Sequence, residues 1–171
     1  MSDDDFPSNS IQTSLPLVGV SRDPLVDGRQ SDRVLDIQRG ACRCLIALGL
    51  APVPEVTLAT GRRADIAALS RTGDIWIVEI KSSLADFRAD SKWEEYRDFC
   101  DRFLFAVDTD FPVDVIPEHA GLMIADRFGA EVVREAPEDR LSAARRKAVT
   151  LRVARQSALR MRNVLDPKRP S

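Results

Sequence analysis

The sequence has little histidine, little cysteine and no long apolar run. His119 is the only histidine among 171 residues, which excludes any metal site or mechanism that needs two imidazoles. The three cysteines, Cys42, Cys44 and Cys100, are an odd number without zinc-finger spacing, so we expect free thiols rather than disulfides or zinc. The apolar runs are too short to cross a bilayer, and no signal-peptide pattern opens the chain. These absences predict a cytoplasmic protein without a membrane partner.

The overall composition is typical of one globular domain with tails. Hydrophobic residues make up 44% of the chain and charged residues 30%, and the length suffices to bury a core. Residues 1–30 are polar and aperiodic, which predicts a disordered arm. We expect the core to span residues 31–135, a basic amphipathic helix residues 136–165, and a tail residues 166–171.

Alternating helical and strand patterns predict an α/β fold, with a mixed central β-sheet flanked by helices and a C-terminal basic helix. Residues 82–90 are expected to form a polar connection, and the Ser91–Glu94 capping-box pattern predicts a helix over 92–101. Glu138 and Asp139 suit the first turn of the last helix. The remaining expected elements are a helix over 31–48 and strands over 52–60, 66–69, 75–80, 102–107, 121–125 and 130–134.

Residues 61–83 have the pattern of a β-hairpin, and the length of its loop decides which side chains meet. A two-residue loop would set Asp65 opposite Ile80, on the wrong face of the sheet. A three-residue loop ending at Gly73 would set Asp65 opposite Glu79, with Gly73 in the left-handed conformation that such a loop requires. The second register also forms one continuous apolar face, so it is the one we predict.

Opposed carboxylates at Asp65 and Glu79 could share a hard divalent cation, Mg²⁺ or Mn²⁺. Lys81, on the same face as Glu79, could stabilise charge that develops on a phosphoryl group. Glu55 could act as a third acidic ligand, but we favour its interpretation as an exposed glutamate at a strand end. The pattern indicates metal-assisted phosphodiester hydrolysis with Asp65, Glu79 and Lys81 as catalytic residues. The alternative is a solvent-facing pair of Glu79 and Lys81.

Asp65 followed by Glu79-x-Lys81 resembles the motif of the PD-(D/E)xK nuclease superfamily, with Ala64 in place of the proline. The superfamily often takes a further glutamate from the first helix, where this chain offers only Asp36, with Gln38 nearby. The wider pattern, which includes EIKSS, YRDFCDRF and ADRFGA, is similar to the MmcB-type DNA-repair family. The resemblance implies a restriction-endonuclease-like core and a role in DNA repair.

Positive charge is concentrated in the last part of the chain. Residues 141–171 hold nine basic residues and one acidic residue, whereas the first 140 residues hold sixteen basic and twenty-six acidic ones. We expect DNA-backbone contacts from the turn before Asp65 and from the last helix. The expected DNA-binding residues are Arg62, Arg63, Arg145, Arg146, Lys147, Arg152 and Arg155. The alternative is a solvated helix that packs on an acidic body.

The apolar residues of the last helix predict which side of it docks. They share one face, and we expect the helix to pack through that face. The stripe comprises Ala144, Ala148, Leu151, Ala154, Ala158, Met161 and Leu165.

Three functions are compatible with these patterns. The first is a metal-dependent DNA endonuclease or exonuclease that acts in repair, with DNA and other repair proteins as the expected partners. The second is a non-catalytic module on the same fold that binds DNA or recruits a partner. The third is an RNA-directed domain, because no physical feature of the sequence separates RNA from DNA. An intact Asp-Glu-Lys trio favours the first.

Overall fold

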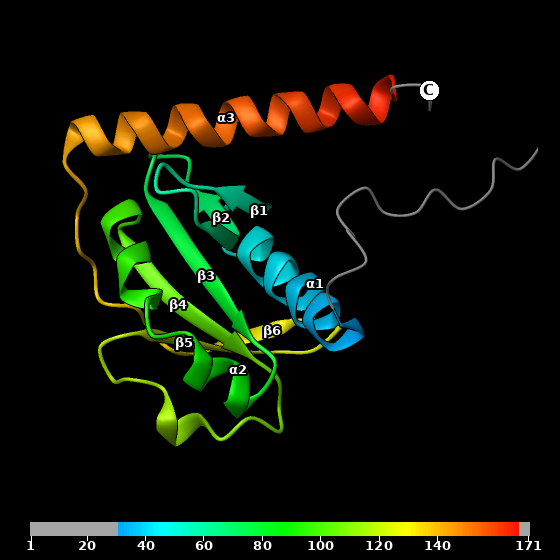
Figure 1. The fold of residues 1–171 in the computed structure, drawn as a ribbon, viewed down its shortest axis with the longest axis vertical. Helices are drawn as coiled ribbons and strands as arrows, with labels where there is room; N and C mark the ends of the chain where they lie inside the picture. The colour runs from blue at the N-terminus through cyan, green and yellow to red at the C-terminus, as the bar shows by residue number, and fades with distance from the viewer. Residues whose placement is uncertain (1–30, 168–171) are drawn as a thin grey trace, which may run out of the picture.

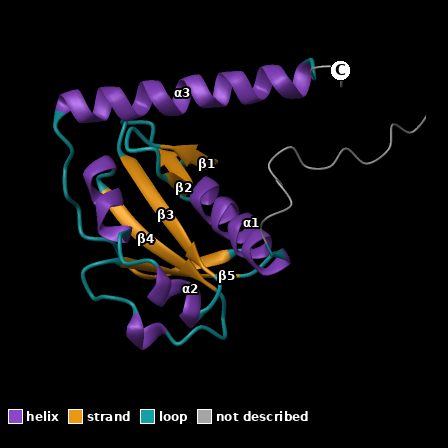
Figure 2. Cartoon of the chain, viewed as in Figure 1, coloured by secondary structure: helices purple, strands orange, loops and turns teal. Residues whose placement is uncertain are grey.

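A computed structural model describes residues 31–167 of the chain. Its centre is a six-stranded sheet in the order β1-β2-β3-β4-β5-β6, with helices on both faces (Figures 1 and 2). The expected α/β fold with a mixed sheet and a C-terminal helix is confirmed. No helix within residues 31–167 is long and apolar enough to cross a bilayer. The elements are α1 (Asp32–Ala47), β1 (Ala51–Thr57), β2 (Arg63–Leu69), β3 (Ile75–Lys81), α2 (Leu84–Ala89), η1 (Trp93–Phe99), β4 (Arg102–Val107), η2 (Val113–Val115), β5 (Gly121–Ala125), β6 (Ala130–Arg134) and α3 (Ala143–Leu165).

The strand directions place three carboxyl ends at one edge of the sheet. Strands β1, β2 and β3 form an antiparallel meander, whereas β3, β4 and β5 are parallel. Strand β6 returns antiparallel to β5. Parallel strands need crossover connections, and here they are made by α2 and η1 between β3 and β4 and by η2 between β4 and β5.

The sheet separates two apolar clusters. Ile77 and Phe105 belong to the cluster that also contains Tyr96 of η1 and Val153 of α3. Intervening strand residues such as Val78 point the other way, into a cluster covered by α1. This division follows from the alternation of side chains along a strand. Helix α1 therefore packs alone on one face, while η1 and α3 cover the other.

The connection between β3 and β4 differs from the prediction. Residues 82–90 contain the short helix α2, whose N-cap Ser83 accepts a hydrogen bond from the Asp86 backbone N–H at 3.1 Å. The capping box at Ser91 and Glu94 does not form, and the expected α-helix over 92–101 is the 3₁₀-helix η1 without a side-chain cap. Packing of Trp93 on Phe103, with stacked rings 5.3 Å apart, accounts for this tighter segment better than local propensity does.

Helix α3 crosses one end of the sheet (Figure 1) and docks through a face that the sequence did not indicate. Its buried residues are Val149 and Val153, whereas Leu151 of the expected stripe is 60% exposed. The expected docking face is therefore wrong. The helix also begins later than expected, at Ala143 after the N-cap Ser142, so Glu138 and Asp139 lie before it.

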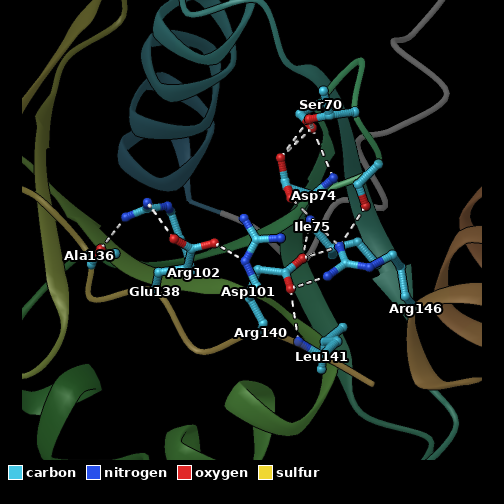
Figure 3. A network of polar contacts seen from close by, with 12 residues as sticks. Ser70, Asp74, Ile75, Asp101, Arg102, Ala136, Glu138, Arg140, Leu141 and Arg146 are labelled. Carbon is cyan, nitrogen blue, oxygen red and sulfur yellow. Dashed lines mark hydrogen bonds and ion pairs between the residues drawn. The ribbon is translucent and has the colours of Figure 1, made fainter. Parts of the chain in front are cut away.

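One buried carboxylate fixes the docking of α3. Asp101 is 2% exposed and accepts hydrogen bonds from the Arg146 guanidinium at 2.6 and 2.7 Å, as Figure 3 shows. It also accepts from the backbone N–H groups of Ile75 and Leu141. These donors hold the pKa of Asp101 below its usual range despite burial. Asp101 thus ties β3, β4 and the start of α3 together.

Candidate active site

The hairpin formed by β2 and β3 has the register that a three-residue loop predicts. Ala67 pairs with Ile77, and Gly73 has a φ of 90°, a left-handed conformation that glycine adopts without a steric penalty. Continuing this register to the start of β2 sets Asp65 opposite Glu79. The predicted loop and register are confirmed.

Strand β3 itself holds the Asp65 side chain. The paired residues of β2 and β3 end at Ile66, and beyond it Asp65 Oδ2 accepts a hydrogen bond from the Ile80 backbone N–H at 2.7 Å. The carboxylate replaces a backbone acceptor at the point where the strands part. Because alternate residues of a strand share a face, Asp65, Glu79 and Lys81 project from the side of the sheet that η1 covers.

Glu79 and Lys81 form a buried ionisable pair. They are 7% and 3% exposed, so the alternative of a solvent-facing pair is wrong. Lys81 Nζ lies 3.4 Å from Glu79 Oε1 and 2.7 Å from Asp90 Oδ2. Glu79 Oε2 is buried and accepts no hydrogen bond from the residues that the structure describes. A buried oxygen without a donor is costly, and its cost suggests that a ligand completes the site.

The two opposed carboxyl groups share a site that disfavours a double negative charge. Burial first, and then the charge of Asp65, raises the pKa of Glu79 to about 8. Burial, together with the charge of Glu55, raises the pKa of Asp65 to about 6. Burial also acts against the charged form of Lys81, but Glu79 and Asp90 outweigh it and raise the lysine pKa. The pair therefore disfavours full ionisation and retains a proton more readily than exposed carboxyl groups do.

A divalent metal suits the residues present, although its ligands are incomplete in the protein. Asp65 and Glu79 are hard oxygen ligands of the kind that Mg²⁺ and Mn²⁺ prefer, and Glu79 Oε2 has a vacant lone pair. Within residues 31–167 no group of three or more His, Cys, Asp or Glu side chains is disposed to hold a metal. Mg²⁺ commonly keeps several waters and uses one or two carboxylates, so two protein ligands meet its needs.

Glu55 is only 9% exposed, so the expectation of an exposed glutamate is wrong, and it lies next to the site in an unusual conformation. The pairs Pro54–Ile66 and Val56–Ala64 on either side of it set it across from Asp65. Its φ is 56°, the one positive φ of a non-glycine residue in residues 31–167, and its carboxylate lies 2.5 Å from Arg63 Nε. Such a backbone persists only where surrounding contacts enforce it. The Arg160 guanidinium of α3 donates to the backbone oxygens of Pro54 and Glu55.

Asp90 and Arg62 form a second polar layer over Lys81. The Asp90 carboxylate accepts a hydrogen bond from Lys81 Nζ. Arg62 lies 4.0 Å from Asp90 and 2.9 Å from Glu95, and its guanidinium sits 5.3 Å from the centre of the Tyr96 ring. The Tyr96 hydroxyl donates to the Arg63 backbone oxygen at 3.0 Å. The sequence does not reveal this contact of Tyr96, because its backbone partner lies 33 residues away along the chain.

The first helix contributes no acid to this group. Helix α1 packs on the opposite face of the sheet, where Asp36 pairs with Arg39 at 3.2 Å and Gln38 is buried. The site is therefore built from β1, β2, β3 and the segment after β3.

A family model described as "DNA repair protein MmcB-like" matches residues 21–168. The chain belongs to the MmcB-like DNA repair family. A solved structure titled "SPO1766 protein of unknown function from Silicibacter pomeroyi" is 42% identical, with a TM-score of 0.79, and the match covers 83% of this chain and 97% of that one. A search of curated proteins gave no match. Family membership supports a role in DNA repair.

The basic residues of α3 in this MmcB-like protein have different surroundings. Arg146 is held by Asp101, and Arg145 pairs with Asp98 at 2.9 Å on the surface. Lys147 is exposed. Arg152 and Arg155 line a groove of about 570 Å³ between β1 and the outer side of α3, with Thr57, Ala148, Leu151, Gln156 and Leu159.

Proposed function

We propose that this MmcB-like protein is a metal-dependent DNA endonuclease or exonuclease of the PD-(D/E)xK type that acts in repair. The observation that carries the proposal is the buried group at the end of β3. A lysine and two opposed carboxylates meet there, and one carboxylate oxygen has no donor. Three free cysteines are compatible with a cytoplasmic protein.

Asp65 and Glu79 would hold Mg²⁺ or Mn²⁺. Arg63 contacts the Glu55 carboxylate. Glu55 could join the metal ligands if Arg63 contacted a DNA phosphate instead. When bound, the ion polarises the phosphoryl group and lowers the pKa of a water molecule.

The chain's own groups orient the substrate and stabilise charge. Lys81 holds a full positive charge, because Glu79 and Asp90 raise its pKa. Its ammonium group can stabilise negative charge on the scissile phosphate. Asp90, 2.7 Å from Nζ, fixes where that ammonium sits. Glu79 and Lys81 are buried, which strengthens the electrostatic interactions that they make.

Basic residues on two elements would bind the DNA backbone. Arg62 and Arg63 flank the metal-binding carboxylates, and Lys147, Arg152 and Arg155 are exposed on α3. Such contacts are independent of sequence and weaken as the salt concentration rises. Arg145 would add to them by exchanging Asp98 for a phosphate, whereas Arg146 would first have to leave Asp101.

A non-catalytic DNA-binding or partner-recruiting module is the second candidate. One observation favours it, namely that the described residues hold no group of three metal-binding side chains. In that function Glu79 and Lys81 would be a buried structural pair, and other repair proteins would supply the chemistry.

The test is cleavage of labelled duplex, single-stranded, flap and junction DNA in Mg²⁺ or Mn²⁺. Wild type is compared with Glu79→Gln, Lys81→Ala and, as a matched control, Glu131→Gln on the exposed face of β6. We expect metal-dependent cutting that both site variants abolish and the control retains. DNA binding without cutting, equal in all four proteins, would establish the non-catalytic module instead.

Thermal unfolding with added metal separates the two functions without a substrate. A nuclease site should raise the Tm of wild type on addition of Mn²⁺, by an amount set by the ratio of metal concentration to Kd. Glu79→Gln should remove most of that shift, and Glu131→Gln should keep it. Equal shifts in all proteins would contradict a metal site at Asp65 and Glu79.

A further inference from the structure

The turn between β5 and β6 exposes an aromatic ring. Phe128 is 74% exposed, more than any other aromatic residue among those described. The guanidinium group of Arg127 lies 5.1 Å from the centre of its ring. Large exposed aromatic side chains are uncommon on a folded surface and often mark a contact.

The turn is rigid, so the exposure of Phe128 is built into the fold. Asp126 Oδ1 accepts hydrogen bonds from the backbone N–H groups of Phe128 and Gly129 at 2.7 and 2.9 Å. Asp126 N–H donates to the Gly129 oxygen at 2.9 Å, and the Arg43 guanidinium of α1 donates to the Arg127 oxygen.

Close backbone packing fixes the turn on α1. A Cβ atom at Gly40 would lie 1.9 Å from the Asp126 oxygen and 2.3 Å from the Gly129 oxygen. Only glycine allows this approach. The ring of Phe128 is thus presented from a fixed platform, which lowers the entropic cost of binding.

The turn lies at the same edge of the sheet as the candidate active site. Lys81 pairs with Val107, and Val107 pairs with Ile124, so Lys81 and Ile124 are two strand spacings, or about 10 Å, apart. The turn begins directly after β5 ends at Ala125. Ligands of open α/β sheets bind outside the carboxyl ends of parallel strands. The turn packs against α1, on the other face of the sheet from Lys81, so a DNA strand bound at Lys81 would reach the turn by crossing the carboxyl ends of β4 and β5.

The chemistry of the turn favours a nucleobase. Neither Arg43 nor Arg127 forms an ion pair with a carboxylate in the described part of the chain, and each directs its guanidinium at the turn itself. The backbone N–H groups of Gly129 and Phe128, and then the charges of Arg127 and Arg43, hold the pKa of Asp126 in the turn below its usual range. The other nearby acids, Asp36 and Asp108, pair with Arg39 and Arg33. A ring flanked by an arginine can stack on the π-face of any base that is not enclosed in a duplex.

We propose that Arg127 and Phe128 stack on an unpaired or displaced base of the same DNA whose phosphodiester is bound at Lys81. This contact selects DNA with a single-stranded segment, gap or lesion over intact duplex. The inference rests on DNA being the ligand, as proposed above, but it does not require cleavage. A ring at a duplex end or junction finds an exposed base, whereas an intact duplex offers only its edges.

The test is equilibrium binding of fluorescent flap and gapped DNA and of matched intact duplex, in EDTA, so that cleavage does not interfere. We expect Phe128→Ala to weaken binding of the flap and gapped DNA about tenfold, as loss of one stacked base does, and to leave duplex binding unchanged. Phe128→Trp should retain wild-type affinity. Val133→Ala on β6, also an exposed apolar residue, serves as control.

Each result decides the inference separately from the nuclease proposal. Loss of preference in Phe128→Ala supports stacking even where no protein cuts DNA. Equal binding of both DNA types by wild type and Phe128→Ala overturns stacking, although cutting that depends on Lys81 would still stand. Absence of DNA binding by wild type overturns stacking, whereas the cleavage assay with metal decides the nuclease proposal. Concentration-dependent dimers of wild type that Phe128→Ala abolishes, with unchanged DNA binding, would identify the turn as a protein contact and also overturn stacking.

Discussion

Lys81 Nζ lies 2.7 Å from Asp90 Oδ2, closer than to Glu79 Oε1 at 3.4 Å. The stronger ion pair thus joins the end of β3 to the C-cap of α2. Asp90 is 17% exposed at its side chain and Lys81 only 4%, so solvent reaches the pair from the Asp90 side. Asp90 positions the ammonium group that the proposed reaction uses.

Asp90→Asn should lower kcat with little effect on KM. The amide keeps the size of the side chain but removes the charge that orients Lys81, and misplacement of such a group costs about ten- to a hundredfold in rate. It should also lower the pKa of Lys81, which shifts the alkaline limb of the pH–rate profile to lower pH. Glu131→Gln, at an exposed carboxylate of β6, is the control. A reduced rate with an unshifted profile would indicate a purely structural role.

The stability of the wild-type protein in EDTA should fall as pH rises from about 4.5 to about 8. Glu79 has a folded pKa of about 8 against an ordinary value of 4.5, so in this window the folded state binds a proton that the unfolded state has lost. Glu79→Gln removes that proton uptake. Its Tm at pH 8 should exceed that of wild type by at least about 2–4 °C, the shift that 1 kcal/mol produces in a domain of this size.

Thermal unfolding from pH 5 to pH 8 measures this effect, with Glu131→Gln as the exposed control. The gain in Tm of Glu79→Gln should grow with pH, because the cost of ionising Glu79 is then fully present in wild type. A difference in Tm that stays constant over the whole range would show that the pKa of Glu79 is not raised.

Arg146→Ala should reduce the free energy of unfolding by roughly 2–3 kcal/mol, because it leaves the buried Asp101 carboxylate without its bidentate partner. The neighbouring Arg145→Ala breaks an exposed pair with Asp98 and should cost less than about 1 kcal/mol. Urea denaturation of the two variants makes the comparison. Equal losses would contradict the docking role of Arg146.

Substitution by aspartate on either face of α3 tests which face of the helix packs on the body of the protein. Val153 is 1% exposed and Leu151 is 60% exposed. Val153→Asp buries an unpaired carboxylate and should cost about 3 kcal/mol or more, whereas Leu151→Asp should stay within about 0.5 kcal/mol of wild type. Urea denaturation measures both. The reverse order would restore the face that the apolar stripe predicts.

Local patterns in the sequence determined the core of the site. Alternation along β2 and β3 allowed one register, and Gly73 supplied the left-handed residue that its loop needs. The sequence alone was therefore sufficient to place Asp65, Glu79 and Lys81 on one face of the sheet. Asp90 could not, because its contact with Lys81 depends on α2, a six-residue helix too short to give a periodic signal.

The tertiary structure alone decided how α3 docks and where the turn at Phe128 points. The stripe of alanine and leucine on α3 is more apolar than the face that packs, but the body offers the Asp101 carboxylate and the backbone oxygens of β1. Arg146 and Arg160 donate hydrogen bonds to these oxygens. The need of buried polar groups for partners therefore decided which face of α3 docks, rather than the apolar stripe. Likewise, the sequence gives no sign that Gly40 is special. Only the structure shows that the turn of Asp126 and Gly129 packs directly against it. A sequence specifies which faces can be buried, and the partners available across the fold select among them.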